Sequence, residues 1–139
     1  METEIINGIT TKLFETFGED FTIYTENIEQ NLKLPCFFVE LVNSSRKQIV
    51  GKRYKSENVF DIHFFTSEEE DKKEGRNVAS ILLEALKYIK LANGDLLRGT
   101  NMHFENVDEV LHFFVNYNVH LIQLDEKAEK MGELDINQI

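Results

Sequence analysis

Apolar residues near the start of the chain recur with the period of an α-helix. Four of them, spaced four residues apart, define one face: Ile5, Ile9, Leu13 and Phe17. This spacing predicts an amphipathic helix that buries its apolar face. Thr3 is placed to cap its first turn, and Gly18 is placed to end it in a left-handed conformation.

A second helical pattern lies in the middle of the chain. Its apolar face comprises Val78, Ile81, Leu82, Ala85, Leu86 and Ile89. The charged segment 67–76 opens this helix, and Ser67 and Glu70 have the spacing of a capping box. Asn93-Gly94 is a turn signal that we expect to end the helix.

Between the two helices the pattern changes to that of strands. Residues 21–24 alternate between apolar and polar side chains and predict a short strand. Residues 36–42 are almost all apolar, which predicts a central strand covered on both faces. Asn43-Ser44-Ser45 then predicts a turn.

The next segment contains either one long bent strand or two shorter strands. Its two parts are residues 48–54 and 59–65, and a break is expected near Lys55-Ser56-Glu57. In the second part Phe60, Ile62 and Phe64 share one face, whereas Asp61 and His63 share the other.

The most regular pattern is the alternation of apolar and polar side chains from 111 to 121, which predicts a strand with one buried face. Met102 and Phe104 are in phase with it. A tight turn at Val107-Asp108 places Phe104 opposite Leu111 and Met102 opposite Phe113. A slip of one residue would turn every apolar side chain outward, so this pattern favours a defined register.

These elements predict a single α+β domain with the order α-β-β-β-α-β-β. We expect a mainly antiparallel sheet with the helices packed on it, formed by residues 1–124. Residues 125–139 are a charged C-terminal tail with scattered apolar residues, which include Met131. Such a tail is expected to dock on a neighbouring subunit rather than to fold alone.

The charge of the chain changes the range of functions to consider. The formal net charge is -10, from 25 acidic and 15 basic residues. Because phosphate contacts require Lys and Arg, this balance argues against a protein that grips nucleic acid. The chain contains no apolar run of membrane-spanning length, its start lacks the basic region of a signal peptide, and Cys36 is its single cysteine. We therefore expect a soluble intracellular protein without disulfides.

Candidate catalytic and metal-binding groups have simpler explanations. Cys36 follows Pro35 in an apolar strand without a neighbouring base, so we expect a packing cysteine. The expected hairpin places His103 opposite His112 with Glu105 nearby, but a tetrahedral metal site requires further ligands. We therefore predict no enzyme, no metal and no cofactor. No phosphate-binding glycine pattern occurs either.

A group of basic residues in the middle of the chain suggests an interface. It comprises Arg46, Lys47, Lys52, Arg53 and Lys55. Given the overall acidity, we expect this group to contact an acidic protein neighbour rather than nucleic acid.

Two segments and one residue pair carry a resemblance to a known family. The segments are FGEDFTIYTENIEQNLKLPCFFVEL (17–41) and LRGTNMHFENVDEVLHFFVNYNVHL (97–121), and the pair is Arg53-Tyr54. Together they resemble the phage tail terminator family, small proteins encoded in the tail modules of phages and phage-like particles. Met131 fits a methionine in the tail of that family. The expected order of elements also resembles the tail terminator fold.

The resemblance implies a structural virion protein at the neck end of the tail, assembled in the host cytoplasm. Six copies would form a ring that stops polymerisation of the tail tube protein and offers a surface to the head–tail connector protein. In a contractile tail the sheath protein would also end there, and DNA would pass through the channel without specific binding. The candidate interface residues are Arg46, Lys47, Lys52, Arg53, Tyr54, Arg98, Asp108, Glu109 and Met131.

Two alternatives remain at this point. The first is a neck or connector adaptor of the same virion, which would bind the portal complex and not the tail tube. A small-molecule-binding α+β domain would instead use the expected pair of histidines, His103 and His112.

Overall fold

Long strands dominate the structure. The computed structural model describes residues 2–25, 32–66, 72–108 and 110–122. In these ranges it contains α1 (Glu2–Phe17), β1 (Thr22–Tyr24), β2 (Cys36–Val50), β3 (Arg53–Phe65), α2 (Lys72–Ala85), β4 (Tyr88–Lys90), β5 (Leu96–Val107) and β6 (Val110–Ile122). Strands account for 54% of the described residues. Neither described helix is long and apolar enough to cross a bilayer.

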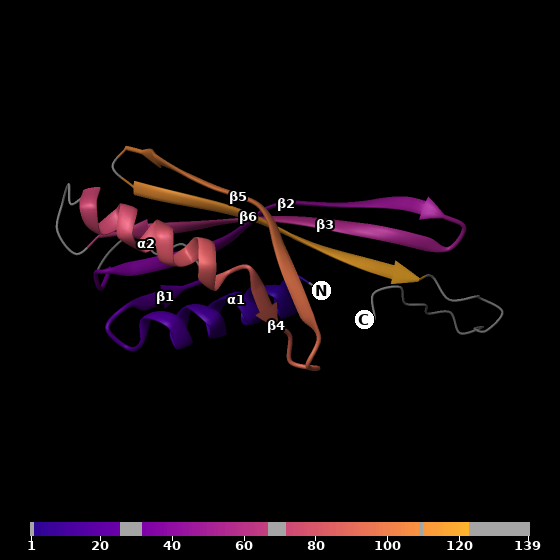
Figure 1. The fold of residues 1–139 in the computed structure, drawn as a ribbon, viewed down its shortest axis with the longest axis horizontal. Helices are drawn as coiled ribbons and strands as arrows, with labels where there is room; N and C mark the ends of the chain where they lie inside the picture. Colours follow the sequence, from indigo (N-terminus) through magenta and orange to yellow (C-terminus); the bar gives the residue numbers. More distant parts are fainter. Residues whose placement is uncertain (1, 26–31, 67–71, 109, 123–139) are drawn as a thin grey trace.

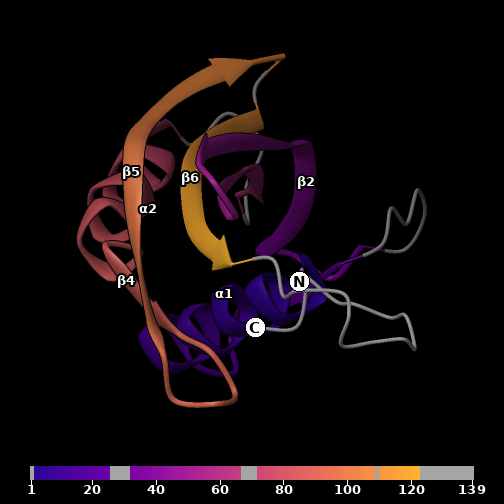
Figure 2. The same ribbon diagram turned by 90° about the vertical axis from the view of Figure 1, so that its right-hand side faces the viewer.

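The six strands form one curled, mixed sheet in the order β1-β2-β3-β6-β5-β4. β1 runs parallel to β2, and the other neighbouring strands are antiparallel. Figure 2 shows the sheet as a half-barrel, seen along the long strands. The predicted α+β class, with a mainly antiparallel sheet, packed helices and the order α-β-β-β-α-β-β, is therefore wrong. The structure is mostly sheet and includes a further strand, β4, after α2.

The expected turn at Asn43-Ser44-Ser45 is wrong because pairing with β3 overrides the local turn preference. β2 continues through these residues to Val50, and β3 follows as one unbroken strand. The predicted coverage of both faces holds for residues 36–39, which are buried, whereas residues 42–50 are exposed. A polar sequence remains extended here since its backbone groups find partners on the neighbouring strand.

The helix α1 forms as its apolar spacing predicts, and it links the two edges of the curled sheet. Ile5, Ile9 and Leu13 are fully buried, and the helix packs against β1 and β2 on one side and β4 on the other. Gly8 permits the close approach to β4, because a Cβ there would lie 3.1 Å from the Lys90 carbonyl oxygen. The expected end is confirmed: Gly18 has a φ of 82° and donates to the Phe14 carbonyl at 2.9 Å.

The second helix ends earlier than the sequence predicts. α2 stops at Ala85, and Ile89 belongs to β4 rather than to the helix. The Tyr117 hydroxyl donates to the Leu86 carbonyl at 2.8 Å, and the Gly99 amide donates to the Lys87 carbonyl at 2.7 Å. These hydrogen bonds use the carbonyl groups of Leu86 and Lys87. In a continued helix, the same carbonyl groups would accept from backbone amides of the next turn. The capping residues predicted at Ser67 and Glu70 lie outside the described residues.

The final hairpin forms, but its register differs by two residues from the prediction. Phe104 pairs with Phe113, and Asn106 pairs with Leu111. The turn contains Asp108, whose φ is 52°, and an irregularity between Thr100 and His103 shifts the remaining pairs. A shift by two residues keeps every side chain on its expected face, so the buried face of β6 is confirmed while its partners change.

The core is one continuous cluster between the sheet and the helices. Its largest fully buried side chains include Tyr117, Phe37, Phe60, Phe64 and Phe113. On β3, Phe60, Ile62 and Phe64 point into this core, as predicted, and Asp61 and His63 lie on the opposite face. Figure 1 shows that the two helices cover only part of the length of the sheet.

Replacement of Gly99 by alanine should destabilise the fold, because the added Cβ would overlap the Leu86 carbonyl oxygen and press on Val115. We expect a loss of about 2–4 kcal/mol in the free energy of unfolding, measured by urea denaturation. The matched control is Gly75→Ala in α2, where a Cβ meets nothing within 4 Å. There the helix preference of alanine should add about 0.5–1 kcal/mol. Equal stability of the two variants would contradict the packing described at Gly99.

Candidate functional site

Three strands extend beyond the helices and form what we call the distal arm. The arm consists of residues 43–50 of β2, 53–58 of β3 and 118–122 of β6. Figure 1 shows the β2–β3 hairpin at one end of the long axis, away from both helices. Residues 43–50 are exposed, so this part of β2 contributes little to the core. Val119 and Leu121 of β6 are buried in the core, so the β2 part of the arm is the candidate for contacts with other molecules.

Buried polar side chains connect the arm to the body of the domain. Asn58 is only 1% exposed, accepts a hydrogen bond from the Ser44 hydroxyl at 2.9 Å and donates to the Tyr117 carbonyl at 3.1 Å. It also donates to the Ser56 hydroxyl at 3.3 Å. Because these bonds join β2, β3 and β6 at the base of the arm, they orient the arm relative to the core.

Over most of its length, the outer edge of β2 has no partner among the described strands. Among the described residues, β1 pairs with it only at Cys36, Phe37 and Phe38. The ladder to β3 is irregular at Val42 and Ile49, which are 53% and 47% exposed. Bulges of this kind re-aim side chains at sheet edges. The edge between them, residues 43–48, pairs regularly with β3 on one side and has no described strand on the other, an arrangement that suits strand addition.

Basic side chains cross the arm in one row. Lys47 of β2, Lys55 of β3 and His120 of β6 occupy directly paired positions. Lys55 forms an ion pair with Glu57 at 3.2 Å. Cationic groups at adjacent cross-strand positions repel one another, so an acidic partner would stabilise this row.

The structure brings together five of the predicted interface residues. Arg46 and Lys47 lie near the end of β2, Lys52 lies in the turn, and Arg53 and Tyr54 begin β3, so all five lie in or beside the distal arm.

The other predicted interface residues lie elsewhere. Asp108 lies in the β5–β6 turn, at the opposite end of the long axis in Figure 1, and Arg98 is an exposed residue of β5 that pairs with Tyr88 of β4. Glu109 and Met131 lie outside the described residues.

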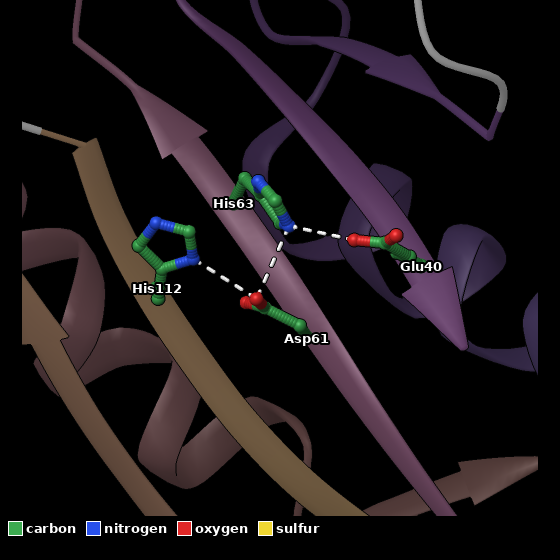
Figure 3. A network of polar contacts seen from close by, with 4 residues as sticks. All are labelled: Glu40, Asp61, His63 and His112. Atoms are coloured by element: carbon green, nitrogen blue, oxygen red, sulfur yellow. Dashed lines mark hydrogen bonds and ion pairs between the residues drawn. The ribbon is translucent and has the colours of Figure 1, made fainter. Parts of the chain in front are cut away.

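A second cluster of polar side chains lies on the face of the sheet that points away from the core (Figure 3). Asp61 accepts hydrogen bonds at one oxygen, Oδ2, from His112 Nδ1 at 2.9 Å and His63 Nε2 at 3.1 Å. His63 Nε2 also lies 3.1 Å from Glu40 Oε1. The two imidazole rings are 4.5 Å apart. We call Glu40, Asp61, His63 and His112 the sheet-face cluster.

The surroundings of the sheet-face cluster shift the pKa values of two of its members, Asp61 and His63. Burial disfavours the charged form of Asp61, but the hydrogen bonds from His63 and His112 outweigh it and lower the pKa of this carboxyl group. The hydrogen bond to Asp61 raises the pKa of His63, although burial acts in the opposite direction. The carboxylate of Asp61 is therefore maintained in a site that is only 7% exposed.

The predicted pair of His103 and His112 does not form. His103 pairs with Phe114 and stacks on its ring, whereas His112 pairs with His63 across the β3–β6 ladder. The sequence placed Asp61 and His63 on one face but gave no register between β3 and β6. That register brings His112 to the cluster.

The remaining candidate groups are explained by packing. Cys36 is buried, and burial raises the pKa of its thiol to about 11, which disfavours the reactive thiolate.

A groove between α1 and β4 has a volume of about 490 Å³ and is lined by residues such as Thr11, Lys12 and Tyr88. No member of the sheet-face cluster lines this groove. The groove therefore has room for a ligand but few side chains that could react with one.

Comparison with known proteins assigns a family to this chain. A family model described as "Phage tail terminator protein" matches residues 4–129, which include all the described strands and nearly all of α1. No curated protein matches the chain. Members of this family are structural tail proteins of phage virions, and they interact with other tail or head–tail proteins. The chain belongs to the phage tail terminator family.

Proposed function

We propose that six copies of this chain form a ring on the last ring of tail tube protein, at the neck end of the tail. The ring stops tube polymerisation and presents a surface to the head–tail connector protein; in a contractile tail the sheath would end there as well. The observation that carries this proposal is the distal arm, in which residues 43–50 of β2 are exposed and pair, among the described strands, only with β3.

Contacts between subunits of the ring are proposed to use the open edge of β2. A head-to-tail contact repeated by rotation closes a ring when the rotation fits. No described strand pairs with the outer side of residues 43–48, and Arg46 and Lys47 within this edge limit indiscriminate pairing. Val42 and Ile49 flank it as exposed apolar side chains, which an adjacent subunit would bury.

Contacts along the tail axis are proposed for the basic residues of the arm. Lys52, Arg53 and Tyr54 lie in or beside the β2–β3 turn, the outermost part of the hairpin in Figure 1. Their charge suits an acidic surface on the tail tube protein, and complementary charge selects the correct partner and orientation. Asp108 lies in the β5–β6 turn at the opposite end of the long axis, and we assign the connector contact to this turn and to Glu109, the next residue in the sequence.

The acidity of the chain is compatible with a channel for DNA. A net charge of -10 repels the phosphate backbone over roughly one Debye length, about 8 Å at physiological salt. DNA would therefore pass without being held. In this role the chain needs no catalytic residue, and residues 125–139, with Met131, would dock on the neighbouring subunit.

Lysine substitution at both Val42 and Ile49 should weaken ring formation. These side chains are exposed in the single subunit, so the fold should tolerate the change, whereas an interface that buries them should not. Native mass spectrometry of the purified protein is expected to show hexamers for the wild type and smaller species for the variant. The matched control, Leu96→Lys, alters a 65% exposed residue of β5 and should leave the hexamer intact. Hexamers of unchanged stability in the double variant would refute the proposed edge contact.

Charge reversal at Lys52 and Arg53 should weaken binding to tube ends, with the largest loss at low salt where electrostatic attraction is strongest. Co-sedimentation with assembled tail tubes measures this binding. Reversal of Lys73 and Arg76, which are exposed on α2, provides a control with a similar change in charge away from the arm. Binding by the arm variant that equals the wild type at both low and high salt would contradict an axial role for these residues.

Deletion of the gene should produce tails of uncontrolled length, visible by electron microscopy, because nothing then stops tube growth. Complementation with the wild-type gene should restore the normal length. Tails of normal length that fail to join heads would instead identify a neck adaptor and overturn the proposed function.

A further inference from the structure

We propose that Asp61, His63 and His112, with Glu40 as a fourth ligand, form a zinc-binding site on the sheet. This inference goes beyond the proposed ring function and does not depend on it. One ligand atom from each of Asp61, His63 and His112 lies within 4.8 Å of the others, and Glu40 Oε1 lies 3.1 Å from His63 Nε2. Figure 3 shows the four side chains converging from β2, β3 and β6.

The position of each ligand follows from the sheet. Asp61 and His63 are two residues apart on β3 and therefore share a face. Glu40 pairs with Asp61 across the β2–β3 ladder, and His112 pairs with His63 across the β3–β6 ladder. Because strand pairing fixes these positions, the ligands need little reorganisation to meet one ion.

The distances are close to those that zinc requires. Zinc–nitrogen and zinc–oxygen bonds of about 2.0–2.2 Å place tetrahedral ligands roughly 3.3–3.5 Å apart. The hydrogen-bonded pairs at Asp61 and His63 are 2.9–3.1 Å apart, so these pairs need to separate by only a few tenths of an ångström. The ligand atoms of Asp61, His63 and His112 already lie within 4.8 Å of one another. A ligand set of two imidazoles and carboxylates suits zinc better than calcium or magnesium, which prefer oxygen ligands alone.

Charge and hydrogen bonding also favour a cation. With neutral histidines the cluster carries two negative charges, from Glu40 and Asp61, which a divalent ion neutralises. A single N–H at His63 Nε2 faces oxygens of both carboxylates and cannot serve both fully. In addition, Asp61 Oδ1 is buried and has no hydrogen-bond partner among the described groups. Coordination to a cation would compensate the buried Asp61 carboxylate for the hydrogen bond that Oδ1 lacks.

Zinc titration of the full chain, stripped of metal by dialysis against a chelator, tests the site. Isothermal titration calorimetry is expected to show one zinc per chain, and His63→Ala and His112→Ala should each weaken binding by at least about 100-fold. The double variant His103→Ala with His120→Ala removes the other two histidines and should bind zinc like the wild type. Absence of binding by the wild type would overturn the proposal, as would equal loss in this control.

A second measurement covers the case in which a histidine variant fails to fold. Asp61→Asn preserves the shape of the side chain but removes its charge. Zinc at about 100 times its Kd should raise the melting temperature of the wild type by roughly 5–10 °C and leave that of Asp61→Asn unchanged. Cobalt bound in place of zinc should give visible absorption bands of a four-coordinate site in the wild type alone. An equal rise in melting temperature for both proteins would refute the site.

Discussion

The curled sheet has one apolar face, and the need to cover that face determines the rest of the structure. The helix α1 reaches from β1 and β2 to β4, at opposite edges of the sheet, and α2 covers the strands between. Such coverage requires close contacts, which is why Gly8 and Gly99 occur where a Cβ would meet the backbone of β4 and the end of α2. The Tyr117 hydroxyl stabilises the same region by donating a hydrogen bond to the Leu86 carbonyl. The two helices are too short to cover the whole length of β2, β3 and β6.

The uncovered length of these strands is what gives the domain a surface for assembly. Since residues 43–50 of the arm are exposed and contribute little to the core, their sequence is free to carry charge and exposed apolar groups without loss of the fold. The backbone of the arm is nevertheless ordered by strand pairing and by the bonds of Asn58. A strand-paired element with an edge that no described strand covers suits a protein whose family acts by contact with other tail proteins. The sheet-face cluster lies near the base of this arm, where a bound ion would tie its three strands together.

Family membership was already visible in the sequence as a resemblance, and the family model confirms it. The fold class was not predicted correctly. The polar residues Asn43-Ser44-Ser45 have strong turn preferences of their own. They remain extended because they pair with β3, which lies further along the sequence. Similarly, the apolar spacing that suggested a longer second helix includes Ile89, but bonds from Gly99 and Tyr117 to the carbonyls after α2 divert the chain into β4. These outcomes depend on distant partners, which local propensity does not include.

By itself the sequence determined which side of β3 and of β6 a residue occupies. Alternation placed Phe60, Ile62 and Phe64 in the core and Asp61 with His63 on the other face, and the structure agrees. Only the tertiary structure decided which strands pair and in what register, so that His112 meets His63 rather than His103. The physical reason is the two-residue period of a strand. A shift of two residues leaves every side chain on the same face, so the hydrophobic pattern specifies faces while packing and turns select partners.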